Sequence, residues 1–240
     1  MNIDKNDRDP VWEYNLGSDK KARLYEVSVF LFLIVPSMAL SFFAVKQGDL
    51  SFELVAWATI LRDAALVCLI LYFLWQNGEP AERLGWSFEH FWKEFAVGLG
   101  LFIPLYFGAG LLEDALQKVG LSLPATPVPS YMIPGDIPKL VLAVFLVTVV
   151  GVAEETIFRG YLIMRFQDLN TGKLTAIVLS AFIFSIGHGY EGTAGVITVG
   201  AMGLAFALVY LWRRSLVAPM IMHCLFDFVS IVVAPVLGLK

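Results

Sequence analysis

Long apolar runs constrain this chain more than any other feature of its sequence. Seven stretches approach the roughly 20 mostly apolar residues that a helix needs to cross a bilayer. They cover residues 24–46, 54–75, 95–112, 138–166, 174–187, 195–212 and 215–237. Hydrophobic residues make up 58% of the 240 residues and charged residues only 16%, which leaves no polar stretch long enough for a separate soluble domain. The sequence therefore predicts an all-α, polytopic transmembrane bundle within residues 24–240, with about seven spanning helices (six to eight).

The distribution of Lys and Arg predicts how this bundle is oriented. The polar residues 1–23 precede a first apolar run that is too long for the apolar part of a signal peptide, which has about 7 to 15 residues, so we expect that run to be retained. Cations gather in alternate connections, which predicts a cytoplasmic N-terminus by the positive-inside rule and, with an odd number of spans, an external C-terminus. The cations on the predicted inner side are Lys20, Lys21, Arg23, Arg83, Lys93, Arg159, Arg165, Lys173, Arg213 and Arg214.

Two connections have a recognisable character. The proline-rich segment from Glu113 to Lys139 is the longest, and we expect it to form an external cover. The stretch "RLGWSFEHFWKEF" mixes aromatic and charged residues, which predicts an interfacial segment with Trp86 and Trp92 at headgroup level and His90 solvated.

Composition excludes several classes of function. The net charge of −4 offers no basic surface for nucleic acid. Cys68 and Cys224 lie in apolar segments without CxxC spacing, so we expect two small buried hydrophobic residues instead of a disulfide or a thiolate metal site.

A few ionisable residues lie inside the predicted spans, where an Asp, Lys or Arg costs about 2.5 to 3.5 kcal/mol and therefore faces the bundle interior with a partner. Arg62 and Asp63 are adjacent and diverge around a helix, so we interpret them as groups that lock helices together. The others gather in the C-terminal half of the chain: Glu154, Glu155, Arg159, His188, His223 and Asp227.

Helical spacing separates the roles of Glu154 and Glu155. Glu155 and Arg159 are four residues apart on one helix face, with the carboxylate on the N-terminal side, which favours an ion pair. Glu154 is turned by about 100° from Glu155 and does not share that pairing. A carboxylate without a partner in a medium of low dielectric constant takes up a proton readily, as a general base does. Glu154 is therefore the candidate for chemistry.

The remaining polar groups are predicted to reach the same depth. His223 and Asp227 are four residues apart, as are Phe184 and His188, so each pair shares a helix face. A rise of 1.5 Å per residue places Glu154 about 21 Å, His188 about 22 Å, His223 about 14 Å and Asp227 about 20 Å from the predicted cytoplasmic ends of their helices. We expect them to converge in one buried site.

Three short motifs in this region resemble those of a known family. "EETIFR" looks like the EExxxR motif of the CPBP intramembrane proteases, the family of the type II CAAX prenyl endopeptidases and of bacteriocin self-immunity proteins. "FSIGH" is similar to the second motif, FxxxH, and "HCLFD" to the third, HxxxN or HxxxD. The resemblance covers a core of about residues 138–233.

The resemblance implies a membrane-embedded, glutamate-type endopeptidase without a cofactor. Glu154 and His188 would activate a water, His223 with Asp227 would support the oxyanion, and Glu155 with Arg159 would brace the site beside Phe184. Prenyl endopeptidases have Asn at the position of Asp227. Because an ionised carboxylate cannot donate to an oxyanion, Asp227 must be protonated or must orient His223 by accepting its ring proton, and we favour the second role.

Other functions remain open. Glu154, His188, His223 and Asp227 also form a plausible zinc ligand set with an open position for water, so a zinc-dependent form of the protease is an alternative. Buried Glu, His and Asp residues also build ion pathways in transporters, although no inverted repeat is visible. A non-catalytic immunity scaffold is a further alternative. The expected partners are membrane lipid and a peptide or membrane-protein substrate, in a bacterial inner membrane.

Overall fold

The computed structural model describes residues 20–44, 51–123 and 133–238; for residues 40–44 it describes the backbone only. Residues 1–19 of the predicted N-terminal segment and residues 124–132 of the predicted external cover lie outside the described residues. Within the described ranges the chain is helical and contains no strand.

Six helical segments are long and apolar enough to cross a membrane. The elements in chain order are α1 (Lys20–Ala44), α2 (Phe52–Gln76), the 3-10 turn η1 (Ala81–Leu84), α3 (Phe91–Lys118), α4 (Ile137–Glu155), the π-helical η3 (Thr156–Leu162), α5 (Ile163–Asp168), α6 (Lys173–Ile186), the 3-10 turn η4 (Gly189–Glu191), α7 (Gly192–Arg213), α8 (Val217–Asp227), the π-helical η5 (Phe228–Val233) and α9 (Ala234–Val236). The prediction of a polytopic helical bundle is confirmed.

Local sequence explains where two of the long helices begin. The Ser51 side chain accepts a hydrogen bond from the Leu54 backbone N–H at 3.2 Å, and the Asp136 side chain accepts one from Lys139 N–H at 2.9 Å. Each satisfies a donor that the first turn of a helix leaves without a partner. Pro138 lies in the first turn of α4, where its missing N–H is not needed.

The helices differ from the predicted spans at two places. α3 continues to Lys118, so Glu113 belongs to a helix and the connection to α4 is shorter than the sequence indicated. α6 has only 14 residues, a length of about 21 Å, which is less than the roughly 30 Å of a bilayer core. It is therefore a short apolar helix beside the six long ones.

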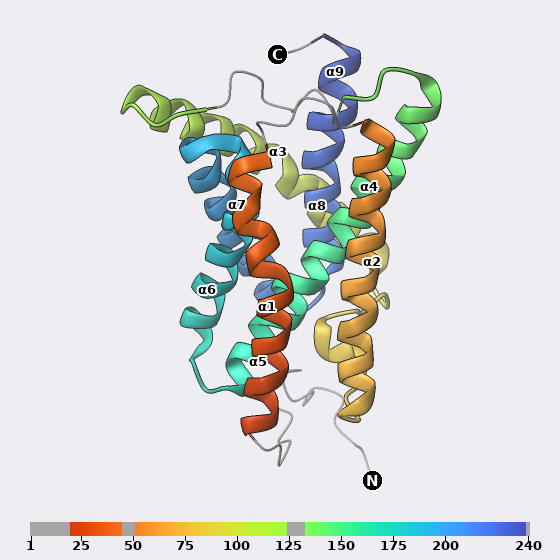
Figure 1. Cartoon of the computed structure of the whole chain (residues 1–240), viewed down its shortest axis with the longest axis vertical. Coiled ribbons are helices and arrows are strands. Elements are labelled where there is room, and N and C mark those ends of the chain that lie inside the picture. The colour runs from red at the N-terminus through yellow and green to blue at the C-terminus, as the bar shows by residue number, and fades with distance from the viewer. Residues whose placement is uncertain (1–19, 45–50, 124–132, 239–240) are drawn as a thin grey trace.

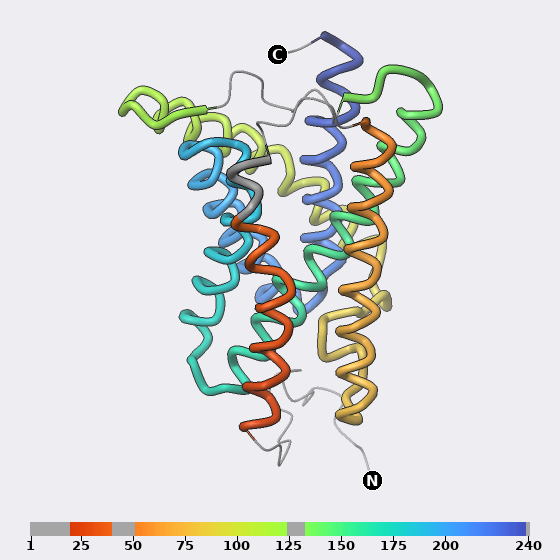
Figure 2. The backbone as a smooth tube through the Cα atoms, viewed as in Figure 1, coloured from red at the N-terminus to blue at the C-terminus, as the bar shows by residue number. Residues whose placement is uncertain are grey.

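The arrangement places α1 and α2 apart on one side of the bundle, with the continuous α4–η3–α5 segment crossing behind and between them (Figure 1). α6 and α7 pack together on one flank, and α8 lies next to α3 and α4 in the interior (Figure 2). The C-terminal part of α3 projects sideways from the bundle (Figure 1).

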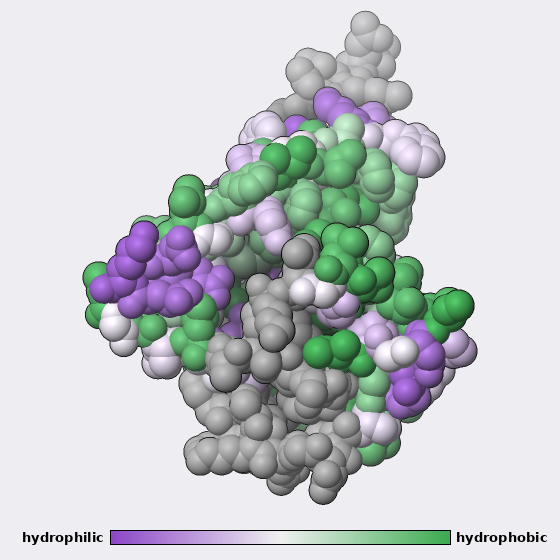
Figure 3. All heavy atoms as spheres, turned by 90° about the horizontal axis from the view of Figure 1, so that it is seen from above, coloured by the Kyte–Doolittle hydropathy of each residue, from purple (hydrophilic) through white to green (hydrophobic). Residues whose placement is uncertain are grey.

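The outer surface is suited to lipid. Seen from above, hydrophobic residues cover much of the described surface and hydrophilic residues gather in separate patches (Figure 3). Large apolar side chains such as Phe32, Leu174 and Trp75 are about three-quarters exposed. Cys68 is also exposed and Cys224 is only half-buried, so the prediction of two buried cysteines is wrong: the Cys68 side of α2 faces outward instead of into the core.

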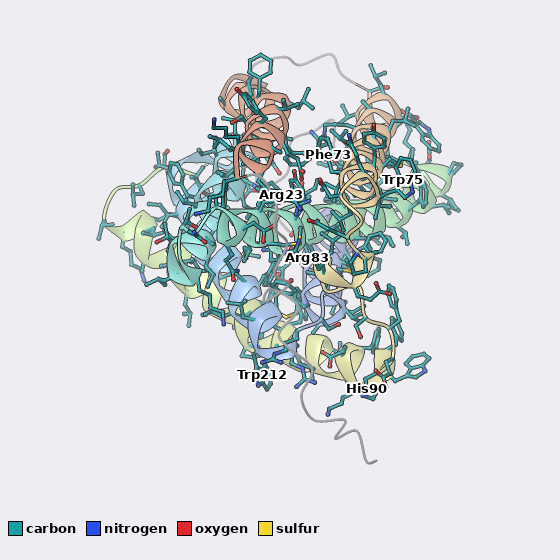
Figure 4. The ribbon with its side chains drawn as sticks, turned by 90° about the horizontal axis from the view of Figure 1, so that it is seen from below. Arg23, Phe73, Trp75, Arg83, His90 and Trp212 are labelled. Carbon is teal, nitrogen blue, oxygen red and sulfur yellow. The ribbon has the colours of Figure 1, made fainter. Side chains whose placement is uncertain are left out.

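An ion-pair network closes the end of the bundle where α1 begins. Its members are three arginines and three carboxylates: Arg23, Arg83, Arg165, Glu26, Glu79 and Asp168. Arg165 is fully buried, with Nε 2.6 Å from Glu26 Oε1 and Nη1 2.7 Å from Glu79 Oε2. Figure 4 views this end from below, with Arg23 and Arg83 near its centre and Trp75 and Trp212 at its rim. The network ties α1, η1 and α5 together.

Several residues that the sequence assigned to the inner side or to the membrane interface belong to the bundle itself. Arg83 and Arg165 are buried in ion pairs because carboxylates from other elements surround them. Trp86 donates its indole N–H to Thr156 Oγ1 at 3.1 Å and packs against the core, while Trp92 and His90 are exposed. Trp86 is therefore a packing residue, and only Trp92 has the exposure expected at headgroup level.

Candidate active site

The polar residues singled out in the sequence come from three separate segments. Glu154 and Glu155 end α4, His188 lies between α6 and η4, and His223 and Asp227 lie on α8. The two π-helical segments, η3 and η5, begin directly after Glu155 and Asp227. Single π-helical turns inside α-helices occur frequently at functional sites.

Helices α4 and α8 approach closely just before these residues. A Cβ placed on Gly151 would lie 2.5 Å from Cys224 Sγ and 3.1 Å from Cys224 N, so a larger residue must displace the thiol and push against the α8 backbone. Only glycine lets the two backbones pack at this distance. This close packing brings the ends of α4 and α8 within side-chain reach of each other.

Glu155 is the centre of the most buried part of the site. Its Oε1 accepts a hydrogen bond from Arg159 Nη1 at 2.8 Å, which is the ion pair predicted from their spacing. The same oxygen lies 2.7 Å from His223 Nδ1. Glu155 and Arg159 are at most 1% exposed and His223 is 4% exposed. Glu155 therefore supports both a cation and an imidazole, a role that the sequence analysis missed.

Aromatic rings and one glycine make the compartment for Arg159. Its guanidinium carbon lies 4.2 Å from the centre of the Phe184 ring and 5.3 Å from that of Phe206. A Cβ on Gly203 would lie 3.2 Å from Arg159 Nη2, so the absence of a side chain there leaves room for the guanidinium. Cation–π contacts add to the Glu155 pair and hold Arg159 in the interior.

Glu154 faces His223 at slightly more than hydrogen-bonding distance. His223 Nε2 lies 3.6 Å from Glu154 Oε2 and 3.6 Å from Asp227 Oδ2, too far for direct hydrogen bonds. Glu154 Oε2 is buried and has no hydrogen-bond partner among the described residues. Both ring nitrogens of His223 thus face carboxylate oxygens, an arrangement that suits an imidazolium, which donates from both nitrogens.

His188 has a defined tautomer when neutral. Its Nδ1 lies 3.1 Å from the backbone oxygen of Phe184, and a carbonyl oxygen can only accept, so Nδ1 carries the proton. Nε2 is then the acceptor. The Phe184 ring centre is 4.8 Å from that of His188, as expected from their spacing in the sequence.

One cavity of about 260 Å³ brings these residues together. Its lining includes Glu154, His188, His223, Asp227 and Phe184. Apolar residues from α1, α2, α4 and η3 complete its walls, among them Ile34, Met38, Leu66 and Ile157. The four polar side chains from three chain segments therefore share one partly apolar chamber, as the depth argument predicted.

Three expectations about contacts in this chamber need correction. Glu154 lies 3.6 Å from His223 Nε2, and among the described residues no hydrogen bond or ion pair joins Glu154 to His188, although both line the cavity. The hydrogen bond that orients His223 comes from Glu155, since Asp227 Oδ2 is 3.6 Å from Nε2. These differences arise because α8, not the end of α6, packs directly on the end of α4.

The third correction concerns Arg62 and Asp63 of α2. Arg62 Nε donates to Asp63 Oδ1 at 2.8 Å within the same helix, and among the described residues no ion pair joins either residue to another helix. Both residues line the cavity. Their side chains can meet although the residues are adjacent, since the long Arg side chain folds back along the helix.

The described residues do not form a metal site in this arrangement. Among them no group of three or more His, Cys, Asp or Glu side chains is placed to hold a metal ion. The geometric reason is that Glu155 engages Nδ1 of His223, while Glu154 and Asp227 stand 3.6 Å from Nε2.

Comparison with known proteins agrees with the motifs. Residues 136–229 match the family model described as Type II CAAX prenyl endopeptidase Rce1-like. The match spans α4 through the beginning of η5, and so includes every element that carries Glu154, His188, His223 and Asp227. No curated protein matches the chain, and no solved structure does.

Proposed function

We propose that this chain, which is related to the Rce1-like type II CAAX prenyl endopeptidases through residues 136–229, is an intramembrane endopeptidase that uses a glutamate to activate water. The observation that supports it best is the position of Glu154 Oε2, which is buried, lacks a hydrogen-bond partner among the described residues and lies 3.6 Å from His223 Nε2 in the cavity. A carboxylate oxygen in such a place is available to accept a proton from a bound water.

The proposed reaction is the hydrolysis of one peptide bond. Glu154 takes a proton from water while the water oxygen attacks the scissile carbonyl carbon, which forms a tetrahedral intermediate with a negative oxygen. Glu154 then gives the proton to the leaving nitrogen as the C–N bond breaks. One water is consumed, and a new carboxyl group and a new amine are formed.

The two histidines have different parts in this proposal. His188 faces the cavity with Nε2 as its acceptor, so it can hold the attacking water together with Glu154. His223 carries a proton on Nδ1 towards Glu155 and can donate from Nε2 to the developing oxyanion. Glu155 acts as a positioning residue through His223.

Asp227 supports His223 electrostatically in this scheme. An ionised carboxylate cannot donate a hydrogen bond, so Asp227 does not bind the oxyanion directly. Its Oδ2 lies 3.6 Å from Nε2, close enough to favour a positive imidazole ring. The donation to the oxyanion then comes from His223 alone among these residues.

The helical bundle supports a membrane location for the proposed enzyme. We propose an integral membrane enzyme in a bacterial inner membrane with a cytoplasmic N-terminus, acting on peptides or membrane-associated proteins without a metal cofactor. The six long apolar helices and the exposed apolar surface support the membrane location. The substrate must bring its peptide bond to the depth of Glu154 near the end of α4.

The test is cleavage of quenched fluorescent peptides by purified protein in detergent and in liposomes. Glu154→Gln and His188→Ala should each lower kcat by about 10² to 10⁴, the usual contribution of a general acid–base group. His223→Ala should lower kcat similarly, because removing one oxyanion donor costs about 10² to 10³.

Matched controls are present in the chain. His90→Ala removes the third histidine and Glu82→Gln removes a carboxylate, and both residues are exposed and outside the cavity. Both control variants should keep wild-type activity. Full activity in Glu154→Gln, with correct folding shown by thermal unfolding, would overturn the proposal.

A further inference from the structure

A half-exposed guanidinium lies in the middle of an apolar helix. Arg62 is the eleventh residue of α2, about 15 Å along the helix from Phe52. Its side chain is 53% exposed, whereas that of its partner Asp63 is 2% exposed. A cation at this depth is costly unless it faces a cavity, and Arg62 does line the cavity that holds Glu154.

The pairing with Asp63 leaves most of the Arg62 donors available. Only Nε donates to Asp63, at 2.8 Å, and neither terminal nitrogen makes a hydrogen bond within the described residues. Asp63 thus fixes one edge of the guanidinium plane. The opposite edge, which carries the two terminal nitrogens, has the fork geometry that binds a carboxylate through two parallel hydrogen bonds.

Arg62 is the one permanent cation among the described residues that line the cavity, and it is separate from the Glu155-bound imidazole of His223 that is proposed to bind the oxyanion. Of the described lining residues, Arg62 alone is an Arg or Lys, while the acidic members are Asp63, Glu154 and Asp227. An anionic group that enters the chamber is repelled by these carboxylates and attracted by the guanidinium. A carboxylate of the substrate is therefore favoured where it lies directly on Arg62, away from Glu154 and Asp227.

The depth of Arg62 identifies the chemical class of the anion. A bilayer core is about 30 Å thick, so a group about 15 Å along α2 lies near its middle, far from lipid phosphates. A peptide substrate, in contrast, can carry a carboxylate to this depth, either at its C-terminus or on an Asp or Glu side chain. These two sources share the same chemistry.

From these observations we propose that Arg62, oriented by Asp63, is a specificity-determining residue that binds a carboxylate of the peptide substrate within the same cavity as Glu154. The assignment rests on the proposed endopeptidase function for the meaning of "substrate". The binding contact itself does not depend on cleavage. The enzyme would then prefer peptides whose carboxylate can reach Arg62 while the scissile bond lies at Glu154 in the same cavity.

The experiment measures peptide binding to the full-length Glu154→Gln variant, which separates binding from hydrolysis. One labelled apolar peptide is compared in four forms: a free C-terminal carboxylate, a C-terminal amide, an amide with one internal Asp, and an amide with Asn at that place. Charge-assisted hydrogen bonds predict that at least one acidic form binds about 10-fold tighter than its neutral counterpart. Whichever acidic form shows the preference identifies the source of the carboxylate.

Variants of Arg62 decide whether this residue is responsible. In Arg62→Gln the preference for the acidic peptide should disappear, and in Arg62→Lys, which keeps the charge but not the fork, it should be reduced but remain. Asp63→Asn should weaken the preference less than Arg62→Gln does. Thermal unfolding of each variant shows that it is folded.

The outcomes are distinct for the two proposals. Equal binding of acidic and neutral peptides by Glu154→Gln, or an unchanged preference in Arg62→Gln, would overturn the carboxylate subsite. Cleavage by the wild type is measured separately on the same peptides. If acidic peptides bind through Arg62 and none is cleaved, the subsite stands and the endopeptidase function fails.

Discussion

The Nδ1 of His223 lies 2.7 Å from Oε1 of Glu155, so the second carboxylate of the EE pair holds the imidazole that faces the first. Because Arg159 donates to the same oxygen at 2.8 Å, one acceptor joins the end of α4, the π-helical segment η3 and α8. Geometry at Glu154 therefore depends on a residue that does not reach the cavity, since Glu155 is absent from its lining.

Replacing Glu155 with Gln should affect activity and stability separately. The neutral amide leaves Arg159 as a buried charge without its partner, which costs about 3 to 5 kcal/mol in the free energy of unfolding. Misplacement of His223 should lower kcat by about 10²-fold with little change in KM. In Glu155→Gln/Arg159→Met, thermal unfolding should recover while kcat stays low. Recovery of both would mean that Glu155 only balances a charge.

The glycine at the α4–α8 crossing should be intolerant of a larger residue. Gly151→Leu should push α4 away from Cys224, separate Glu154 from His223 and cost about 1 to 3 kcal/mol in the free energy of unfolding, with a larger relative loss of peptidase activity. Cys224→Ala, which removes only the thiol at the contact, should remain active. Wild-type activity in Gly151→Leu would contradict the close packing of these helices.

Removing the central arginine of the ion-pair network should be strongly destabilising. Arg165→Met removes a fully buried arginine that pairs with both Glu26 and Glu79, at a cost of about 3 to 5 kcal/mol. The matched variant is Arg213→Met, because the Arg213–Glu94 pair joins α3 and α7 nearer the surface, where the Arg213 side chain is 17% exposed. Thermal unfolding in one detergent should show a clearly larger fall for Arg165→Met than for Arg213→Met. Equal falls would argue against the network as a closing element.

Metal removal should leave the activity unchanged. In the described structure Nδ1 of His223 is 2.7 Å from Glu155 Oε1, while Glu154 and Asp227 each lie 3.6 Å from Nε2, and the proposed mechanism needs no metal at these groups. We expect the same rate of peptide cleavage before and after dialysis against a strong chelator. Loss of activity with chelator, and its return with added zinc, would instead favour the zinc-dependent form of the protease.

The orientation of the bundle can be measured with single cysteines. In a Cys68→Ala/Cys224→Ala background, His90→Cys places a thiol before α3, at the end viewed in Figure 4, and Gly135→Cys places one before α4 at the opposite end (Figure 1). An impermeant maleimide applied to intact cells should label residue 135 and leave residue 90 unlabelled. The reverse pattern would place the N-terminus outside.

Patterns along the sequence predicted the long helices and the ion pair between Glu155 and Arg159 within one helix. Long apolar runs located the spans, and the four-residue spacing of Glu155 and Arg159 predicted their ion pair. Both follow from the periodicity of a single helix, which a sequence displays directly.

Contacts between different helices were harder to predict from the sequence. The sequence placed Glu154, His188 and His223 at similar depths, but which histidine lies next to Glu154 depends on which helix packs against α4. A signal did exist at Gly151, since a glycine in an apolar helix often marks close approach of a second backbone. No local signal predicts the pairing of Arg165 with Glu26 and Glu79, because these carboxylates lie far from it in the chain.

Hydrophobic mismatch is built into one flank of this protein. α6 is about 9 Å shorter than a typical bilayer core, and it ends at the turn that carries His188. If α6 spans the membrane, either the bilayer beside that flank is locally thinner or the polar turn with His188 lies within the acyl region. We therefore expect the acyl chain length of the surrounding lipid to change how far His188 lies from bulk water on this side. Membranes of different thickness should accordingly change the hydration of the cavity without any change in the protein sequence.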